Sequence, residues 1–228
     1  MVAGAVKGEP HANLRVTTSA RLVGLSFDDG PTVADTPYVL GLLADAHARA
    51  TFFDVGRFAA LHPALVRREL RAGHEVANHT YDHIALTHAE AHSALRVPER
   101  TITREIALDR SALCRAGAPD PKLFRPPYGR GVFNREIEAL AVAQGERIIG
   151  WDLALEHYID NARPLPSSVA ALLARVRPGS IILAHDGPGS RQRTITALPL
   201  LLGGLKRLGY RAVSITTLLR SNAVARSG

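Results

Sequence analysis

The sequence predicts an α/β fold in which about seven strand-and-helix units form a single domain around a parallel sheet or barrel. Short apolar, β-branched runs alternate along the chain with longer segments whose apolar residues have helical spacing, which is typical of repeated β-α units. The chain has 228 residues, of which 46% are hydrophobic and 21% charged, a balance typical of a folded globular domain. Single barrels of this class use roughly 200 to 250 residues. We therefore expect one fold rather than two.

Seven segments are predicted as strands, because each is short and mostly apolar, as expected of strands buried on both faces. In chain order they are 22–27, 51–55, 75–78, 123–125, 147–152, 180–185 and 211–213. Six intervening segments are predicted as helices, and several of them have proline at or near the first turn. In chain order these are 37–49, 63–72, 98–115, 135–144, 167–175 and 194–208. Gly73, Gly145 and Gly209 lie where helices are expected to end.

The domain organisation is predicted from the absence of breaks in this pattern. No linker rich in Gly, Pro and Ser divides the chain, and no internal repeat is found. We expect the folded domain to extend over residues 21–219, with an N-terminal extension at 1–20 and a C-terminal tail at 220–228. The first twenty residues lack the uninterrupted apolar segment of a signal peptide, so either the protein stays inside the cell or the chain is a mature or trimmed form.

Composition excludes several classes of protein. Cys114 is the single cysteine, so we expect no internal disulfide, and any metal must be held by His, Asp or Glu. No apolar run reaches the roughly 18 to 20 residues that span a bilayer, so no membrane span is expected. The net charge is +7, but the arginines are spread singly along the chain, and we expect no nucleic-acid partner. The charge is compatible with an acidic glycan or wall polymer.

Polar residues gather where four of the predicted strands end. In chain order these strand ends carry Asp28-Asp29-Gly30-Pro31, then Asn78 to His83, then Arg125 to Tyr128, then His185-Asp186. The loops that follow the strands of a β/α barrel build its active site. The sequence therefore predicts that these residues share one site.

His79 and His83 are candidate metal ligands. A spacing of four places two imidazoles on one face of a helical turn, where they can share an ion with a carboxylate from elsewhere. Asp28 and Asp29 are adjacent at a strand end, so their side chains are expected to point in opposite directions and to do different work. One can bind a metal while the other handles protons. The alternatives are histidines that cap a helix and an ordinary Asp-Gly-Pro turn.

A site of two histidines and one carboxylate leaves open positions on the metal, as a hydrolytic centre needs. Arg125 offers a positive fork that can keep a carboxylate ionised, and His185 offers a general acid whose ordinary pKa is near neutrality. Taken alone, each is equally compatible with a surface arginine and a core histidine.

From about Arg21 to Leu219 the chain closely resembles the polysaccharide deacetylases of carbohydrate esterase family 4, the NodB-homology family. Four segments resemble successive family motifs: SFDDGP at 26–31, HTYDH at 79–83, RPPYG at 125–129 and LAHD at 183–186. ATFFDVG and AGHEVANH, around them, are also similar to the family. Four motifs in the family's order are much more specific than any one of them.

The resemblance implies a distorted barrel of β-α units and a role for each matched residue. Asp29, His79 and His83 would bind a divalent metal, most often zinc and sometimes cobalt or another ion. Asp28 would be the catalytic base, held by Arg125, and His185 would be the acid that protonates the leaving amine. The backbone N–H of Tyr128 would stabilise the oxyanion. Leu183 would line the pocket for the acetyl methyl. The full set expected to contact substrate is Pro126, Leu183, Trp151 and Tyr158.

The family's fourth motif is altered. That motif usually has an aspartate, two further residues and then Asp-Trp, whereas residues 151–158 read WDLALEHY. The alignment places Ala154 at the first aspartate, His157 at the second and Tyr158 at the tryptophan. The expected carboxylate partner is therefore missing. Asp152 or Glu156 could take over the tuning of the arginine and the acid, or that support could be absent.

The function implied is a metal-dependent hydrolase that removes acetyl groups from N-acetylglucosamine-containing carbohydrate, either chitooligosaccharide or peptidoglycan. The partner expected is an N-acetylated glycan. One alternative is an O-acetyl esterase that acts on xylan with the same residues. A second is a non-catalytic glycan-binding protein that keeps the metal site, and a third is an intracellular deacetylase of a small amino sugar.

Overall fold

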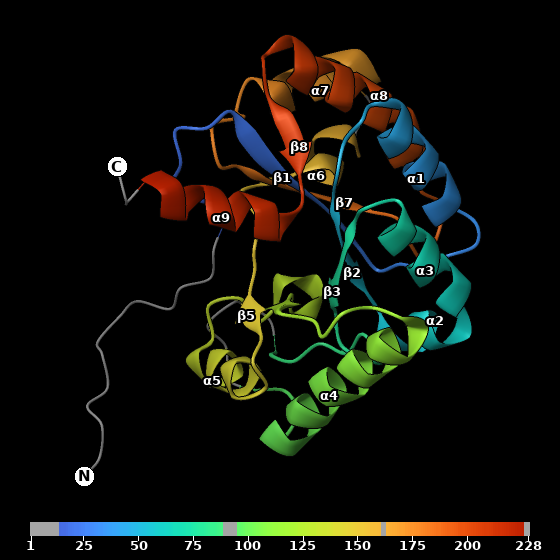
Figure 1. Ribbon diagram of the computed structural model, residues 1–228, viewed down its shortest axis with the longest axis vertical. Coiled ribbons are helices and arrows are strands. Elements are labelled where there is room, and N and C mark those ends of the chain that lie inside the picture. Colours follow the sequence, from blue (N-terminus) through green and yellow to red (C-terminus); the bar gives the residue numbers. More distant parts are fainter. Residues whose placement is uncertain (1–13, 89–94, 161–162, 226–228) are drawn as a thin grey trace.

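The computed structural model describes residues 14–88, 95–160 and 163–225, and within them a parallel sheet curves into a distorted barrel (Figure 1). Every ladder between named strands is parallel, and the order is β5-β4-β3-β2-β1-β7-β6, with β8 also paired to β1. The strands are β1 (Leu22–Asp28), β2 (Thr51–Asp54), β3 (Glu75–Asn78), β4 (Leu123–Phe124), β5 (Arg147–Ile148), β6 (Leu153–Ala154), β7 (Ile181–His185) and β8 (Arg211–Val213). The predicted fold class is confirmed.

Helices cover the outside of the sheet in two groups. In Figure 1, α1, α7 and α8 lie at one end of the view, and α4 and α5 lie at the other. The helices are α1 (Thr36–Asp45), α2 (Gly56–Leu61), α3 (Pro63–Arg71), α4 (Glu99–Ala116), α5 (Arg135–Ala143), α6 (Leu155–Ile159), α7 (Leu165–Leu173), α8 (Gln192–Arg207) and α9 (Ile215–Ala225), with a 3-10 turn at Pro127–Gly129. No helix in the described ranges is long and apolar enough to cross a membrane.

Alternation along the strands separates the barrel interior from the outer core. Phe27 on β1 and Phe52 on β2 belong to the outer hydrophobic cluster, beneath α1, α7 and α8, and their rings stack 5.2 Å apart. Their neighbours Ser26 and Phe53 point the other way, into the barrel. Since side chains alternate with a period of two, Asp28 follows Ser26 onto the inner face. The alternation along β1 therefore places the Asp28 carboxylate at the mouth of the barrel.

The prediction of one strand over 147–152 is wrong. The chain pairs with β4 as β5, leaves the sheet, and pairs with β7 as β6, so the barrel is open between β5 and β6. The Arg125 side chain donates to the backbone oxygens of Ile149 and Gly150, at 3.1 Å each. Because those carbonyls are engaged by a side chain inside the barrel, they do not join a strand ladder.

The other differences lie at the ends of the chain and in short helices. Helix α9 runs past the boundary expected at residue 219 and buries Ile215 and Leu218 in the cluster that fills the barrel beside Phe53. Val16 is also buried and donates to the backbone of Gly179. Residues 14–20 are therefore packed on the domain, and the rest of the expected extension lies outside the described residues. Helices α2 and α6 were not predicted because each is less than two turns long.

Candidate active site

The four polar strand ends meet at one mouth of the barrel, as expected. Asp28 ends β1 and His185 ends β7, and these two residues are register partners on adjacent parallel strands. His79 follows β3 directly, and Arg125 follows β4. Since the carboxyl ends of parallel strands share an edge, residues far apart in sequence become neighbours there.

Asp29, His79 and His83 form a cluster of metal-ligand type. The Oδ1 atom of Asp29 lies 3.3 Å from Nε2 of His79 and 3.0 Å from Nε2 of His83. The Nδ1 atom of His79 lies 2.7 Å from the backbone oxygen of Arg125. A carbonyl only accepts hydrogen bonds, so Nδ1 carries the proton and the Nε2 lone pair faces the cluster.

The electrostatics of this cluster favour an ionised carboxylate. Burial raises the pKa of Asp29, but the hydrogen bonds and positive character of His79 and His83 lower it by more, so the pKa lies below its ordinary value. One carboxylate oxygen and two imidazole nitrogens form a donor set that suits zinc and similar divalent ions. The residues present therefore fit the expected metal.

The two histidines converge, but the predicted helical turn is wrong. Residues 79–83 form a loop in which Thr80 and His83 have left-handed backbone, with φ of 69° and 56°. The ring centroids of His79 and His83 lie 5.0 Å apart. The pair is thus brought together by two backbone reversals rather than by helical periodicity.

Two carboxylates of helix α4 hold this loop in place. Asp109 accepts the backbone N–H of His79 at 2.7 Å, and Glu105 accepts the backbone N–H of Asp82 at 2.8 Å. Sequence reasoning missed both residues. Their signal was a pair of acidic residues spaced by four among buried apolar positions, which indicates a buried polar contact but does not identify its partner.

Asp28 and Asp29 do not point in opposite directions. Asp29 has φ of 76°, outside the extended conformation on which that prediction depended. The two carboxylates therefore face the same imidazole, with Asp28 Oδ2 3.8 Å and Asp29 Oδ1 3.3 Å from His79 Nε2. Different roles for Asp28 and Asp29 must therefore come from their different hydrogen-bond and ion-pair partners.

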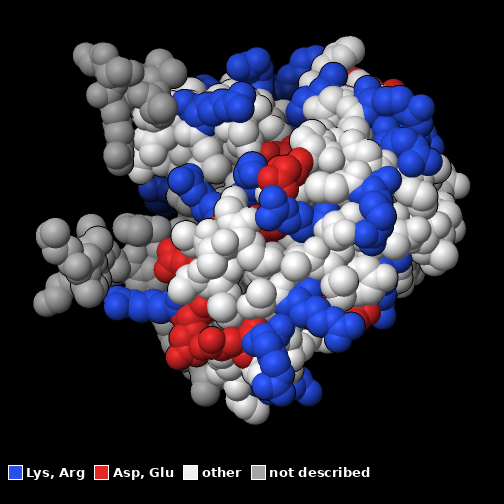
Figure 2. Space-filling model, turned by 60° about the horizontal axis from the view of Figure 1, so that its bottom comes forward, with Lys and Arg blue, Asp and Glu red and all other residues white. Residues whose placement is uncertain are grey.

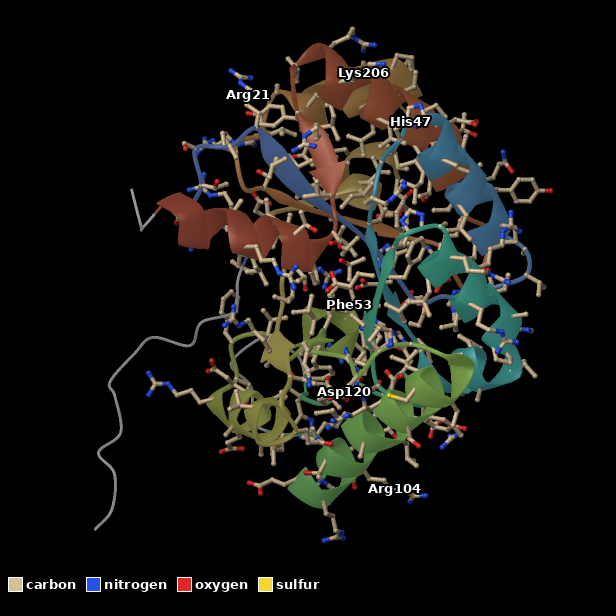
Figure 3. The ribbon with its side chains drawn as sticks, viewed as in Figure 1. Arg21, His47, Phe53, Arg104, Asp120 and Lys206 are labelled. Atoms are coloured by element: carbon tan, nitrogen blue, oxygen red, sulfur yellow. The ribbon has the colours of Figure 1, made fainter. Side chains whose placement is uncertain are left out.

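Arg125 is that different partner for Asp28. Its side chain is wholly buried and donates through Nη1 to Asp28 Oδ1 at 2.6 Å and to Ser26 Oγ at 2.9 Å. The guanidinium lies 4.0 Å from the ring centroid of Phe53, which Figure 3 shows near the centre of the molecule. Burial lowers the pKa of Arg125, while Asp28 raises it. The carboxylate and the guanidinium form a buried pair.

Glu156, not Asp152, contacts the histidine at the end of β7. Glu156 Oε2 lies 3.2 Å from His185 Nδ1, and Oε1 accepts the backbone N–H of His185 at 3.0 Å and the hydroxyl of Thr194 at 2.9 Å. Asp152 instead accepts a hydrogen bond from Ser180. The carboxylate absent from Ala154 is thus supplied two residues later, where the chain turns into α6.

This contact controls the charge of His185. Burial lowers the pKa of His185, but the hydrogen bond that its ring donates to Glu156 and the negative charge of Asp28 raise it by more, so the pKa lies above its ordinary value. Burial raises the pKa of Glu156, and the contact with His185 lowers it by more. The pair therefore favours an imidazolium beside a carboxylate.

The expected substrate-contacting residues are placed unevenly. Tyr128 has left-handed backbone, with φ of 60°, and its exposed ring lies 4.6 Å from that of His83. Leu183 is the register partner of Ser26, faces the barrel interior with it and is 3% exposed. Trp151 is half-buried, with its ring 5.4 Å from the Arg125 guanidinium.

Pro126 and Tyr158 lie on the margins of this arrangement. Pro126 is buried between the arginine that follows β4 and the 3-10 turn. Tyr158 lies on α6, where it packs partly against the outer core and, with Trp151, lines a groove beside β6.

Arg191 is a further residue that sequence reasoning missed. Its Nη2 atom lies 3.5 Å from Asp29 Oδ2 and donates to the backbone of Gly187 at 2.9 Å. The two oxygens of Asp29 therefore have separate neighbours, with Oδ1 facing the histidines. Nothing in the local sequence distinguishes this arginine from the others that are spread along the chain.

The fold and the site together define a β/α-barrel hydrolase with a two-histidine, one-carboxylate cluster beside a buried acid-base arrangement. A family model described as polysaccharide deacetylase matches residues 15–149. The chain belongs to the polysaccharide deacetylase family, and it is an enzyme of that class.

Relatives of known name cover most of the chain. A peptidoglycan-N-acetylglucosamine deacetylase of Bacillus cereus is 33% identical over 206 residues, which cover 90% of this chain and 91% of that protein. A chitooligosaccharide deacetylase of Bradyrhizobium sp. is 37% identical over 205 residues, covering 85% and 88%. A family 4 carbohydrate esterase from Streptomyces lividans, solved in complex with acetate, matches with a TM-score of 0.72 and 31% identity over 86% of this chain and 93% of that one.

Proposed function

We propose that the protein is a metal-dependent deacetylase of glycans that contain N-acetylglucosamine, in which Asp28 is the base and His185 the acid. The observation that carries the proposal is the position of the buried Asp28–Arg125 pair, beside the Asp29, His79 and His83 cluster and next to His185. A site that only held a glycan would need neither a buried base nor an acid on the adjacent strand. Relatives named as deacetylases of peptidoglycan and chitooligosaccharide support the substrate class.

Asp29, His79 and His83 would hold the metal, and the ion assigned to them is zinc, because nitrogen and carboxylate donors suit it. When bound, a divalent ion there would lower the pKa of a water molecule and polarise the acetyl carbonyl. Oδ1 of Asp29 faces both imidazoles, so it is the oxygen assigned to the ion.

Asp28 takes the proton of the attacking water. Its Oδ1 is engaged by Arg125, while Oδ2 faces the cluster, 3.8 Å from His79 Nε2. The guanidinium fixes the orientation of the carboxylate, so that the free oxygen is the one able to receive the proton. The new C–O bond forms as this proton leaves the water, and the carbonyl oxygen becomes an oxyanion.

Residues at other strand ends would stabilise the oxyanion and protonate the leaving nitrogen. The backbone N–H of Tyr128, in the turn after Arg125, would donate to the oxyanion. His185 then gives its proton to the amine nitrogen as the C–N bond breaks, which releases acetate and the free amino sugar. Glu156 supports that step by holding His185 in its protonated form.

The test is acetate release from short N-acetylglucosamine oligomers, followed by mass spectrometry after chelation and again with Zn²⁺ or Co²⁺ restored. We expect deacetylation only with metal. Asp28→Asn is expected to lower turnover by about 10²- to 10⁴-fold with metal content unchanged. His79→Ala is expected to lose both turnover and bound metal. Asp45→Asn, an exposed carboxylate on α1, is the matched control.

Two results would overturn parts of the proposal. Full activity in the Asp28→Asn protein would remove the base assignment. Acetate release from acetylated xylan, with none from the N-acetylglucosamine oligomers, would identify the protein as an O-acetyl esterase that uses the same site.

A further inference from the structure

A groove of about 730 Å³ runs beside the edge strand β6, on the open side of the barrel. Its lining includes Arg15, Arg175, Arg177 and the imidazole of His157. All four side chains are exposed, and none of the three arginines forms an ion pair with a residue in the described ranges. In Figure 2, Lys and Arg side chains spread across much of the face in view, whereas Asp and Glu are fewer and more localised.

The carboxylate that also lines this groove is already engaged. Asp152 accepts the Ser180 hydroxyl through Oδ2 at 2.8 Å and the backbone N–H of Ile181 through Oδ1 at 2.7 Å. Both of its oxygens are thus used to hold the start of β7. The charge of Arg15 also acts on Asp152. Arg175 and Arg177 form no ion pair with a carboxylate in the described part of the chain and remain available to a ligand.

The backbone places two of these arginines next to each other. Residues Arg177 to Ser180 form a tight turn, closed by the Ser180 N–H to the Arg177 oxygen at 3.0 Å, with φ of 82° at Gly179. A Cβ atom at Gly179 would lie 1.7 Å from the backbone oxygen of Val16. Glycine therefore lets the N-terminal segment approach the turn, where Arg15 pairs with Ser180 through an isolated antiparallel bridge.

The groove adjoins the candidate active site at a shared lining residue. Trp151 lines both the groove and a smaller hollow of about 270 Å³, which Tyr128 also lines. The Tyr128 ring lies 4.6 Å from that of His83 in the metal-ligand cluster. A polymer that passes the cluster can therefore continue over two aromatic side chains into the groove.

We propose that the groove beside β6 binds carboxylates of an acidic glycan, at a distance from the acetyl group being removed. The inference rests on the proposed function and names a subsite for the same substrate chain. Guanidinium groups match carboxylates in shape and charge.

The test compares binding of two oligomers of equal length by titration calorimetry. One is a neutral N-acetylglucosamine oligomer, and the other is a peptidoglycan-derived strand in which alternate sugars carry lactyl carboxylates. We expect the protein to bind the acidic strand about 3- to 10-fold more tightly at low salt, the effect of two exposed ion pairs. The double variant Arg175→Gln/Arg177→Gln is expected to lose this preference and to bind the neutral oligomer unchanged.

Arg68→Gln/Arg220→Gln removes the same charge from exposed positions on α3 and α9 and is the control. An equal loss in the control would overturn the proposal, because the preference would then come from net charge alone. A wild-type protein that binds both oligomers equally, or a groove variant that keeps the preference, would overturn it as well. The calorimetry measures binding and does not depend on turnover. A protein that prefers the acidic strand but deacetylates neither oligomer would therefore refute the proposed function and leave the proposed binding role of the groove standing.

Discussion

Replacing Glu156 with glutamine should move the pH range in which the enzyme works. The substitution keeps the size of the side chain and removes the negative charge 3.2 Å from Nδ1 of His185. A hydrogen bond to a charged group contributes about 1.5 to 3 kcal/mol, and one pKa unit corresponds to about 1.4 kcal/mol. The substitution therefore removes about 1.5 to 3 kcal/mol of preference for the imidazolium, and the His185 pKa is expected to fall.

The sign follows from the role of His185 as an acid. The wild-type pKa is raised, so the imidazolium persists to higher pH and the activity is lost as pH rises through that pKa. In Glu156→Gln the alkaline limb of kcat should move to lower pH, because the pKa of His185 falls. At pH values below both limbs, where the imidazolium forms in either protein, turnover should be close to that of the wild type.

Two measurements check this expectation, the pH profile of kcat and an NMR titration of the His185 ring. Glu136→Gln, which removes an exposed carboxylate on α5, should change neither. An unchanged pKa of His185 in Glu156→Gln would refute the reasoning, whatever happens to the rate. A uniform loss of kcat without a shifted limb would assign Glu156 a structural role only.

Other expectations concern the buried groups around the site. Arg125→Gln should lower the free energy of unfolding by about 3 to 5 kcal/mol in chemical denaturation, because Asp28 would be left as a buried charge without its partner; unchanged stability would contradict the buried pair. Burial raises the pKa of Glu146 from 4.5 to about 8, so the folded state binds an extra proton and stability should fall as pH rises between those values, by at most about 1.4 kcal/mol per unit. Glu146→Gln should remove that slope and be more stable at pH 8, which melting curves at several pH values would reveal. Gly30→Ala should cost about 1 to 3 kcal/mol and weaken metal binding, measured by competition with a chelating dye, because its Cβ would lie 2.6 Å from Asp186 Oδ1; wild-type stability and affinity would contradict that close contact.

The sequence was sufficient to predict the strands that build the site, because each combines an apolar run with polar residues at its end. β1 and β7 carry their signals within a few residues, and their parallel pairing places Asp28 beside His185. The inward direction of the Ser26 side chain also follows from the period-two alternation of β1 alone. These features are local, and a single sequence reports them directly.

Features that depend on contacts between distant segments could not be predicted. The loop at 79–83 takes its shape from Asp109 and Glu105, carboxylates on α4 that follow the loop by more than twenty residues. The choice between Asp152 and Glu156 was open in the sequence, because it depends on where the chain turns after β6.

The opening of the barrel has a further consequence for how this enzyme can change. The segment between β5 and β6 supplies two backbone oxygens, those of Ile149 and Gly150, to the Arg125 guanidinium, and the same guanidinium holds Asp28. An insertion, deletion or proline that shifted this segment would leave a buried cation short of acceptors and would disturb the base at the same time. The connection at the barrel opening is therefore expected to tolerate changes of side chain better than changes of backbone path.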